Sequence, residues 1–320
     1  MTKILITGAA GQIGAELTIS LRTKYGSNNV LATDIREPAD AALVLDGPFE
    51  ILDALDRAKL VKLVRGFKAN RIYHLSEILS ATDEKYPVGS WDLNMQSLLN
   101  VLDVAREEHL ERVFWPSSIA VFGKGSKKVK CGQFDIQHPS TVDGISKSAG
   151  ELWCNYYFEK YAVDVRSIRY PGLISYKTLP GGGTTDYAAH IYYKAVIEKK
   201  YTCYLKENTR LPMMYMDDAI RATLELMEAD AAKLSIRTSY NLSAMDFTPG
   251  EIASSIKENI EEFTMQYAPD YRQQIADSWP ANMDDYYATR DWGWKPAYNL
   301  KAMTKDMLMH LSGAFINNYY

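Results

Sequence analysis

The sequence predicts an α/β protein with a doubly wound parallel sheet and a smaller, mixed α/β lobe in its second half. Three observations carry this prediction. The first half of the 320-residue chain alternates short β-like runs with longer helical stretches. A glycine-rich turn separates the first run from the first helical stretch. The composition, 47% apolar and 24% charged, is that of a globular chain with a substantial core, which excludes disorder, collagen and coiled coil.

Six short runs in the first half are the strand candidates, and four helical patterns lie between them. We expect strands at residues 4–7, 30–33, 49–52, 71–75, 112–115 and 163–168. We expect helices at residues 12–24, 56–67, 88–109 and 144–161. In the third helix, apolar residues recur at helical spacing, which predicts one stripe that packs on the sheet or on a partner subunit. The stripe consists of Leu98, Leu99, Leu102 and Ala105.

The pattern of turn-forming residues changes after Tyr170-Pro171-Gly172, and a run of three glycines follows at residues 181–183. We therefore predict a first domain at residues 1–174 that contains the parallel sheet and a smaller lobe at residues 175–320, with some later segments returning to the sheet. In the lobe we expect helices at 184–200, 217–228 and 249–263, a short extended run at 201–205, and further segments at 284–292 and 300–311.

Charge and cysteine usage exclude several classes of function. The 36 basic and 40 acidic residues give a net charge of -4, and the basic residues are dispersed apart from a short run at 127–130, so neither nucleic acid nor an anionic membrane is an expected partner. Three cysteines without C-x-x-C spacing fit a reducing compartment, and the five scattered histidines predict no metal site. No apolar stretch approaches the ~18 residues of a membrane span. The chain begins directly with a strand pattern, so we expect a cytoplasmic protein, or a mitochondrial matrix protein after processing if the source is eukaryotic.

The glycine-rich turn is Gly8-Ala9-Ala10-Gly11-Gln12-Ile13-Gly14, which follows a strand and opens a helix. Absent side chains let backbone amides reach a pyrophosphate at a helix N-terminus, so this context predicts a dinucleotide site rather than a plain glycine turn.

Asp34 stands twenty positions after Gly14 at the end of the second strand, where a carboxylate binds an adenosine ribose. Such a carboxylate repels a 2′-phosphate and favours NAD over NADP, although Arg36 acts in the opposite direction. Asp34 as a solvated or capping residue is the alternative. Asp53, after the third strand, is a weaker candidate for the adenine, with helix entry as its alternative.

The fifth strand ends in Trp115-Pro116-Ser117-Ser118, and Lys147 follows 29 positions after Ser118. With the glycine turn, these residues resemble an extended short-chain dehydrogenase/reductase, a superfamily that uses Ser/Thr, Tyr and Lys. The resemblance narrows to the short-chain type of L-threonine 3-dehydrogenase and covers nearly the whole chain. The segments that carry it are Leu79-Ser80-Ala81, Trp91-Asp92-Leu93-Asn94, Arg169-Tyr170-Pro171-Gly172, Gly181-Gly182-Gly183-Thr184-Thr185-Asp186-Tyr187, Pro212-Met213-Met214-Tyr215 and Asp277-Ser278-Trp279-Pro280.

This resemblance implies a Rossmann-type fold and NAD-dependent oxidation of the β-hydroxyl of L-threonine to 2-amino-3-oxobutyrate, without a metal. It implies that Ser118 bonds the substrate hydroxyl and Lys147 the cofactor ribose. The expected cofactor-binding residues are Gly8, Gly11, Gln12, Ile13, Gly14, Asp34, Ile35, Arg36, Asp53, Ala54, Leu75, Ser76, Asn94, Lys147, Tyr170 and Pro171. The expected substrate-binding residues are Ser80, Ser117, Ser118, Thr185 and Asp186, with helix capping as the alternative for Ser118 and for Asp186.

Two acids depart from the family pattern. Asp143 stands where the family has its catalytic tyrosine, in the segment Thr141-Val142-Asp143-Gly144-Ile145-Ser146-Lys147. An aspartate is shorter and a weaker base than a phenol held near a lysine, so Ser118, Asp143 and Lys147 form a catalytic set with impaired chemistry, in which Asp143 pairs with Lys147. Glu77 stands where the family has a small apolar residue. It either weakens cofactor binding near the phosphates or turns to solvent.

The family also implies a homodimer through the helices at 88–109 and 144–161, the second of which carries the aromatic residues Tyr156, Tyr157 and Phe158. Two other functions remain open. One is a nucleotide-sugar epimerase or dehydratase, against which the Gly-Gly-Gly-Thr-Thr-Asp segment argues. The other is a non-catalytic NAD(H)-binding module, which Asp143 makes more credible.

Overall fold

The computed structural model describes residues 2–38, 41–77, 84, 86–178 and 181–317. Its contacts divide the chain into two compact units. The first unit contains residues 1–118, 142–169 and 220–240, and the second contains residues 119–141, 170–219 and 241–320. The predicted boundary near residue 175 lies close to the division after Arg169. Residues 119–141 belong to the second unit although the sequence on either side belongs to the first. Residues 220–240 belong to the first unit although the sequence on either side belongs to the second.

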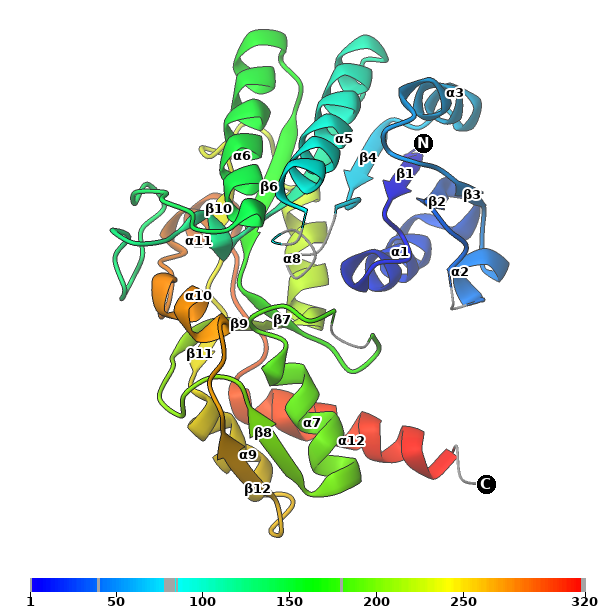
Figure 1. Cartoon of the computed structure of the whole chain (residues 1–320). Coiled ribbons are helices and arrows are strands. Elements are labelled where there is room, and N and C mark those ends of the chain that lie inside the picture. The colour runs from blue at the N-terminus through cyan, green and yellow to red at the C-terminus, as the bar shows by residue number, and fades with distance from the viewer. Residues whose placement is uncertain (1, 39–40, 78–83, 85, 179–180, 318–320) are drawn as a thin grey trace. The chain divides into compact units, whose positions relative to one another are not determined.

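A seven-stranded sheet forms the centre of the first unit, in the order β10-β6-β5-β4-β1-β2-β3 (Figure 1). β1 lies between β2 and β4 and pairs in parallel with both, with Ile4 opposite Val30 and Arg71. The chain thus builds outward in both directions from β1, which places the topological switch point between β1 and β4. The strands are β1 (Ile4–Thr7), β2 (Val30–Asp34), β3 (Phe49–Ile51), β4 (Arg71–His74), β5 (Arg112–Ser118), β6 (Val165–Tyr170) and β10 (Tyr240–Asn241).

The doubly wound α/β fold predicted from the sequence is confirmed, and all six expected runs are strands. β5 continues three residues further than expected, and β6 is displaced by two residues. The seventh strand, β10, comes from the second half of the chain, where the sequence showed no separate strand pattern at this position.

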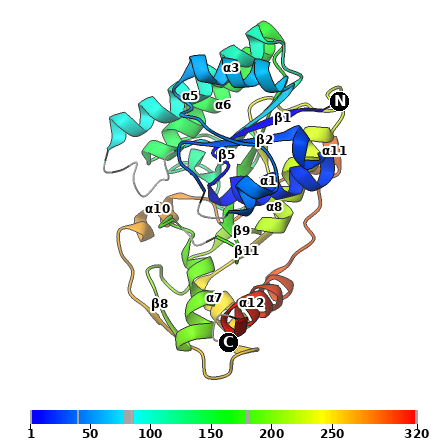
Figure 2. The same ribbon diagram turned by 90° about the vertical axis from the view of Figure 1, so that its right-hand side faces the viewer.

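Helices cover both faces of this sheet. Figure 2 shows α3, α5 and α6 on one side of β1 and β2, and α1 with α8 on the other. The predicted apolar stripe of α5 is confirmed, because Leu98 and Leu102 are fully buried in a cluster that includes Leu5 and Ile72 of the sheet. The helices of this unit are α1 (Gln12–Tyr25), α2 (Ala42–Leu45), α3 (Arg57–Phe67), α5 (Pro87–Glu107), α6 (Val142–Tyr161) and most of α8 (Met216–Glu228).

Local sequence explains where these helices begin and end. Asp56 caps α3 by accepting a hydrogen bond from the amide of Lys59 at 2.9 Å. Pro87 occupies the first turn of α5. Proline is tolerated there because the N–H groups of the first turn have no acceptor within the helix, so the N–H that proline lacks breaks no helical hydrogen bond. Gly26, with φ +88°, ends α1.

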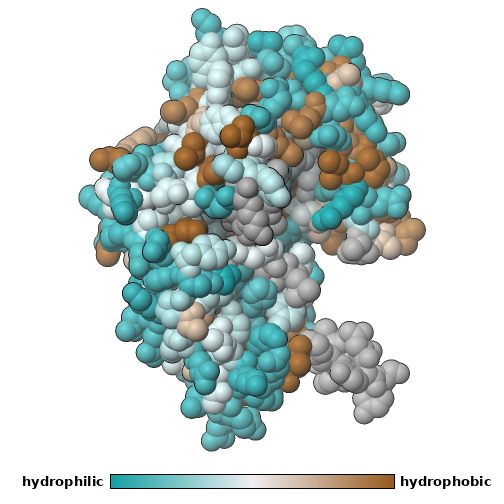
Figure 3. All heavy atoms as spheres, in the orientation of Figure 1, coloured by the Kyte–Doolittle hydropathy of each residue, from teal (hydrophilic) through white to brown (hydrophobic). Residues whose placement is uncertain are grey.

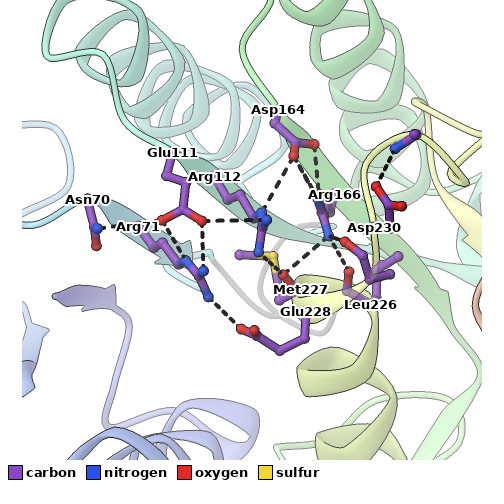
Figure 4. Close-up of polar contacts among 12 residues, drawn as sticks. Asn70, Arg71, Glu111, Arg112, Asp164, Arg166, Leu226, Met227, Glu228 and Asp230 are labelled. Carbon is purple, nitrogen blue, oxygen red and sulfur yellow. Dashed lines mark hydrogen bonds and ion pairs between the residues drawn. The ribbon is translucent and has the colours of Figure 1, made fainter. Parts of the chain in front are cut away.

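Arginines at the amino ends of three adjacent strands hold the end of α8 against this edge of the sheet (Figure 4). Arg112, which begins β5, donates to the carbonyl oxygen of Met227 at 2.7 Å. Arg166 of β6 donates to the carbonyl oxygens of Leu226 and Ala229, both at 2.7 Å. The last carbonyls of a helix have no partner within it and lie at the negative end of the helix dipole, so guanidinium groups satisfy them well.

The second unit contains a three-stranded sheet, in the order β11-β9-β7, and a parallel pair, β12 and β8. Its core includes the fully buried Tyr187, Tyr192 and Ile252. The elements are β7 (Gly172–Ile174), α7 (Tyr187–Glu198), β8 (Lys200–Cys203), β9 (Leu211–Tyr215), β11 (Met245–Phe247), α9 (Pro249–Lys257), β12 (Thr264–Tyr267), α10 (Arg272–Ser278), α11 (Tyr286–Trp292) and α12 (Leu300–Asn317).

The helix expected at residues 249–263 is shorter than predicted, because α9 ends at Lys257. The side chain of Asn259 donates to the carbonyl oxygen of Ser255 at 3.0 Å and takes up an acceptor in the last turn. The chain then enters β12 at Thr264. Across the described part of the chain, no helix is both long and apolar enough to cross a bilayer.

Candidate dinucleotide and active site

The glycine-rich turn joins β1 to α1 in the first unit and leaves no space for a side chain at two positions. Gly8 has φ +72°, and a Cβ there would lie 2.6 Å from the carbonyl carbon of Leu75. A Cβ on Gly14 would lie 2.1 Å from the carbonyl oxygen of Gly8. α1 begins directly after Gly11, with no acidic residue in its first turn and no side chain capping it. Open amide groups at the start of a four-turn helix attract phosphate, so the turn fits the pyrophosphate of a dinucleotide.

Asp34 ends β2 beside this turn. Its Oδ2 accepts a hydrogen bond from the amide of Ala10 at 2.9 Å, so the carboxylate is fixed against the glycine turn. Ile35 and Arg36 follow it at the surface. Asp53, the weaker candidate, accepts a hydrogen bond from the amide of Leu55 at 2.9 Å in the turn that leads to α3, as its helix-entry alternative requires.

Lys147 lies on α6, and its ammonium group is buried at the carboxyl end of the sheet. Its Nζ donates to the carbonyl oxygen of Pro116 at 2.6 Å and lies 4.8 Å from the ring centroid of Trp115. It also forms an ion pair with Glu77, which lies in the loop after β4. The Lys147 side chain is 5% exposed and that of Glu77 is 27% exposed. Glu77 therefore does not simply turn to solvent, because its carboxylate is the counter-ion of a buried ammonium.

Asp143 lies in the first turn of α6, four residues before Lys147. This spacing places the two residues on the same face of the helix. The expectation that Asp143 pairs with Lys147 stays a prediction, whereas the ion pair with Glu77 is present in the structure.

Ser117 belongs to a buried network that the sequence analysis missed. Its hydroxyl donates to Oε1 of Glu151 at 2.6 Å. Arg169 of β6 donates to the same carboxylate twice, from Nε at 2.8 Å and from Nη2 at 2.7 Å. The Arg169 and Glu151 side chains are 3% and 1% exposed. The network ties β5, β6 and α6 together, and Ser118 follows Ser117 directly in the chain. No local pattern in the sequence pairs Glu151 with Arg169, because one lies on a helix and the other on a strand, 18 positions apart.

His74, the last residue of β4, is fully buried beside the same loops. Its Nδ1 lies 2.7 Å from the hydroxyl of Thr7. Burial, together with the nearby ammonium of Lys147, lowers the pKa of His74 to about 3. The ring is therefore neutral at physiological pH and adds no charge to the site.

The second unit holds the remaining substrate candidates. A Cβ on Gly172 would lie 2.7 Å from the side chain of Thr185, so the strand after Tyr170-Pro171 packs closely against Thr185. Asp186 precedes α7, but its side chain makes no capping hydrogen bond, so the capping alternative is wrong. Its Oδ2 instead accepts hydrogen bonds from the amides of Gly182 and Gly183, at 2.6 and 2.7 Å, and fixes the glycine loop.

Most of the predicted cofactor residues lie together in the first unit. Leu75 is held beside the glycine turn, because its amide donates to the carbonyl oxygen of Thr7 at 3.0 Å. The carbonyl oxygen of the buried Ala54 accepts a hydrogen bond from Asn100 at 3.0 Å, and Asn94 lies on the same helix, α5. Ser80 lies outside the described residues. Within the described ranges, no group of three or more His, Cys, Asp or Glu side chains could hold a metal ion.

Comparison with known proteins matches this geometry to a family. The profile described as "NAD dependent epimerase/dehydratase family" matches residues 4–243. A protein of Staphylococcus saprophyticus, named as an uncharacterized epimerase/dehydratase, is 52% identical over 314 residues, which are 98% of each chain.

Solved structures extend the match over the whole fold. The GalE-like L-threonine dehydrogenase of Cupriavidus necator in its holo form is 53% identical, with a TM-score of 0.94 over 97% of this chain and 99% of that one. The L-threonine dehydrogenase of Clostridium difficile is 48% identical, with a TM-score of 0.96 over 98% of both chains. A UDP-glucose 4-epimerase of Thermotoga maritima, 18% identical, shares the fold. The chain belongs to the NAD-dependent epimerase/dehydratase family, the extended short-chain dehydrogenases/reductases.

Proposed function

We propose that the protein oxidises the β-hydroxyl of L-threonine to 2-amino-3-oxobutyrate with NAD, as a step of threonine catabolism. The observation that carries this proposal is the match at 48% and 53% identity, over almost the whole chain, to two L-threonine dehydrogenases. The UDP-glucose epimerase at 18% identity supports the fold alone.

NAD is the cofactor we propose, held by the glycine turn through its pyrophosphate and by Asp34 through its adenosine ribose. When bound, NAD accepts the hydride from the substrate carbon. Asp34 disfavours the 2′-phosphate of NADP because a fixed carboxylate repels it. In Asp34→Asn, an amide oxygen can still accept from Ala10, so the preference for NADH over NADPH in a fluorescence titration should shrink without loss of fold. An unchanged preference would assign the selection to another residue.

The catalytic roles we propose follow the loops at the carboxyl end of the sheet. Ser118 binds the substrate hydroxyl, and Lys147 binds the ribose beside the nicotinamide. Thr185 and Asp186, in the second unit, and Ser80 bind the amino acid's charged groups. Asp143 replaces the phenol that takes the hydroxyl proton elsewhere in the family, so turnover is slower than in a tyrosine-containing relative.

The test is NADH formation from L-threonine at several pH values, for the unmodified chain and for Asp143→Tyr. We expect slow turnover in the former and an increase of up to about 10²–10⁴-fold in the latter, the typical contribution of a positioned acid–base group. An unchanged rate with NAD still bound would refute the role given to position 143. Bound NADH without threonine turnover in either protein would favour a non-catalytic module, and turnover of UDP-sugars would favour an epimerase.

A homodimer through α5 and α6 is the assembly we propose. Both helices expose large apolar side chains, among them Val88 and Leu152, and Figure 3 shows hydrophobic residues on the surface of the first unit. Trp91 and Trp153 line a groove of about 500 Å³ on the same unit. Exposed apolar patches of this kind mark interaction surfaces. Leu152→Glu should shift the mass measured by light scattering from dimer to monomer, whereas a monomeric unmodified chain would refute the proposal.

The cytoplasm is the compartment we propose. Cys131, Cys154 and Cys203 are all free thiols in buried positions, as expected for a reducing environment. Thiol titration of the freshly isolated, denatured protein should find all three cysteines reduced, and an oxidised pair would contradict this assignment.

A further inference from the structure

Glu77 and Lys147 form a charged pair beside β5, the strand that ends at Ser118. Glu77 comes from the loop after β4, Lys147 from α6 and Pro116 from β5, and β4 and β5 are neighbours in the sheet. The Glu77 carboxylate and the Pro116 carbonyl oxygen both contact Nζ of Lys147. Two acceptors of one nitrogen lie within two hydrogen-bond lengths of each other, roughly 6 Å. Glu77 therefore lies close to Pro116, which stands near the end of β5 and two residues before Ser118.

The two acids that depart from the family pattern, Asp143 and Glu77, lie on different elements. Asp143 has one methylene fewer than a glutamate and begins from the backbone of α6. Glu77 contacts the ammonium group of Lys147 from the loop after β4. The chain thus lacks the family's phenol and gains a carboxylate in contact with the family's lysine.

Resting on the proposed threonine oxidation, we propose that Glu77 is the proton acceptor of this enzyme. As the substrate O–H bond breaks, the proton passes to a carboxylate oxygen of Glu77, which becomes a carboxylic acid. The substrate C–H bond breaks with its electron pair, which leaves as hydride to reduce the oxidised nicotinamide ring, and a C=O bond forms. Lys147 stays protonated throughout and stabilises the Glu77 carboxylate before the transfer. Glu77 then returns the proton to water.

The pH dependence of turnover distinguishes a carboxylate acceptor from a phenol. A carboxylate and a phenol are ionised over different pH ranges, because the ordinary pKa of a phenol lies near 10. We expect the kcat of the unmodified chain to be nearly flat from about pH 6 to 9. The double variant that combines Glu77→Gln with Asp143→Tyr keeps only the phenol, so its kcat should rise with pH through the alkaline range.

The first experiment compares Glu77→Gln with Glu84→Gln. Glu84 belongs to the same β4–α5 connection, and its Oε1 accepts a hydrogen bond from the amide of Val142 at 2.9 Å, so it contacts α6 without touching Lys147. We expect Glu77→Gln to lower kcat by about 10²–10⁴-fold and Glu84→Gln to leave it unchanged. NADH affinity of Glu77→Gln, measured by fluorescence without substrate, should stay within about tenfold of the unmodified chain. A much larger loss of affinity would show a cofactor-binding role instead.

The second experiment separates proton transfer from positioning of Lys147. If Glu77 takes the proton, adding Asp143→Tyr to Glu77→Gln restores turnover through the phenol, with an alkaline pH profile. Formate should likewise restore turnover in Glu77→Ala in proportion to its concentration. If the double variant stays inactive, or if formate rescues Asp143→Ala rather than Glu77→Ala, the inference is overturned.

The two proposals fail in different ways. Threonine turnover that persists in Glu77→Gln overturns the role of Glu77 alone. Absence of threonine turnover in both the unmodified chain and Asp143→Tyr, with NADH bound, overturns the proposed function and this inference together.

Discussion

The buried pair of Glu151 and Arg169 gives the sharpest stability prediction. Glu151 on α6 receives three hydrogen bonds, one from the Ser117 hydroxyl and two from the Arg169 guanidinium, at 2.6, 2.8 and 2.7 Å. Both charged side chains are 3% exposed or less. The perturbation is Glu151→Leu and Arg169→Met, made singly and together.

Each single change leaves one charge buried without its partner, which typically costs about 3–5 kcal/mol. The double change removes both charges and also takes the acceptor from the Ser117 hydroxyl, which costs about 1–3 kcal/mol. The double variant should therefore be more stable than either single variant. Its loss should fall short of the sum of the single losses by about 3 kcal/mol or more, the signature of a buried ion pair.

Urea unfolding followed by tryptophan fluorescence measures these free energies, and hydrogen exchange in peptides from β5, β6 and α6 locates the effect. We expect both single variants to exchange faster in these three elements. Single losses below about 1 kcal/mol would refute the argument, because that is the value of an exposed pair. Strictly additive losses would refute it as well, because they would mean that the two charges do not interact.

Two further predictions concern the strand ends near the glycine turn. The pKa of His74 is about 3 in the folded chain, against an ordinary value of 6.5. The unfolded chain therefore binds the proton more readily than the folded chain. The free energy of unfolding should fall as the pH falls from 6.5 toward 3, by up to about 1.4 kcal/mol per pH unit. His74→Gln should flatten this acid limb in urea unfolding, whereas the exposed His138→Gln should leave it unchanged; equal slopes in both variants would contradict the assignment. Gly14→Ala should cost about 1–3 kcal/mol or more by overpacking, because its Cβ would lie 2.1 Å from a carbonyl oxygen, whereas Gly66→Ala on α3 has open space and should gain about 0.5–1 kcal/mol. Similar melting temperatures of the two glycine variants would show that the backbone of the turn shifts to accommodate the added methyl group.

The sequence predicted those parts of the fold in which a local pattern decides the structure. Residues 4–7 form β1 as expected, because four consecutive apolar or β-branched residues precede a glycine turn. β9 was missed because it contains Pro212, which argues against a paired strand. Its pairing with β7 and β11 joins residues far apart in the chain, such as Gly172, Met213 and Met245. No local pattern encodes such partners.

The candidate site shows the same division. Spacing placed Gly8 and Asp34 at strand ends on one edge of the sheet, and the family resemblance singled out Lys147. The partner of Lys147 could not be predicted from the sequence, because Glu77 lies in the loop after β4, 70 positions away along the chain. Asp143, four positions away on the same helix, was the nearer choice from sequence distance.

The return of residues 220–240 to the first unit has a consequence for synthesis. These residues supply β10 and the carbonyl oxygens that Arg112 and Arg166 bind. At about 5–20 residues per second, a ribosome needs roughly 4–14 s after Arg169 to deliver Tyr240. During that interval the nascent sheet lacks an edge strand, and the guanidinium groups of Arg112 and Arg166 lack their carbonyl acceptors, while the chain of the other unit is synthesised. A gene fragment that stops at residue 174 therefore encodes an unfinished nucleotide-binding unit.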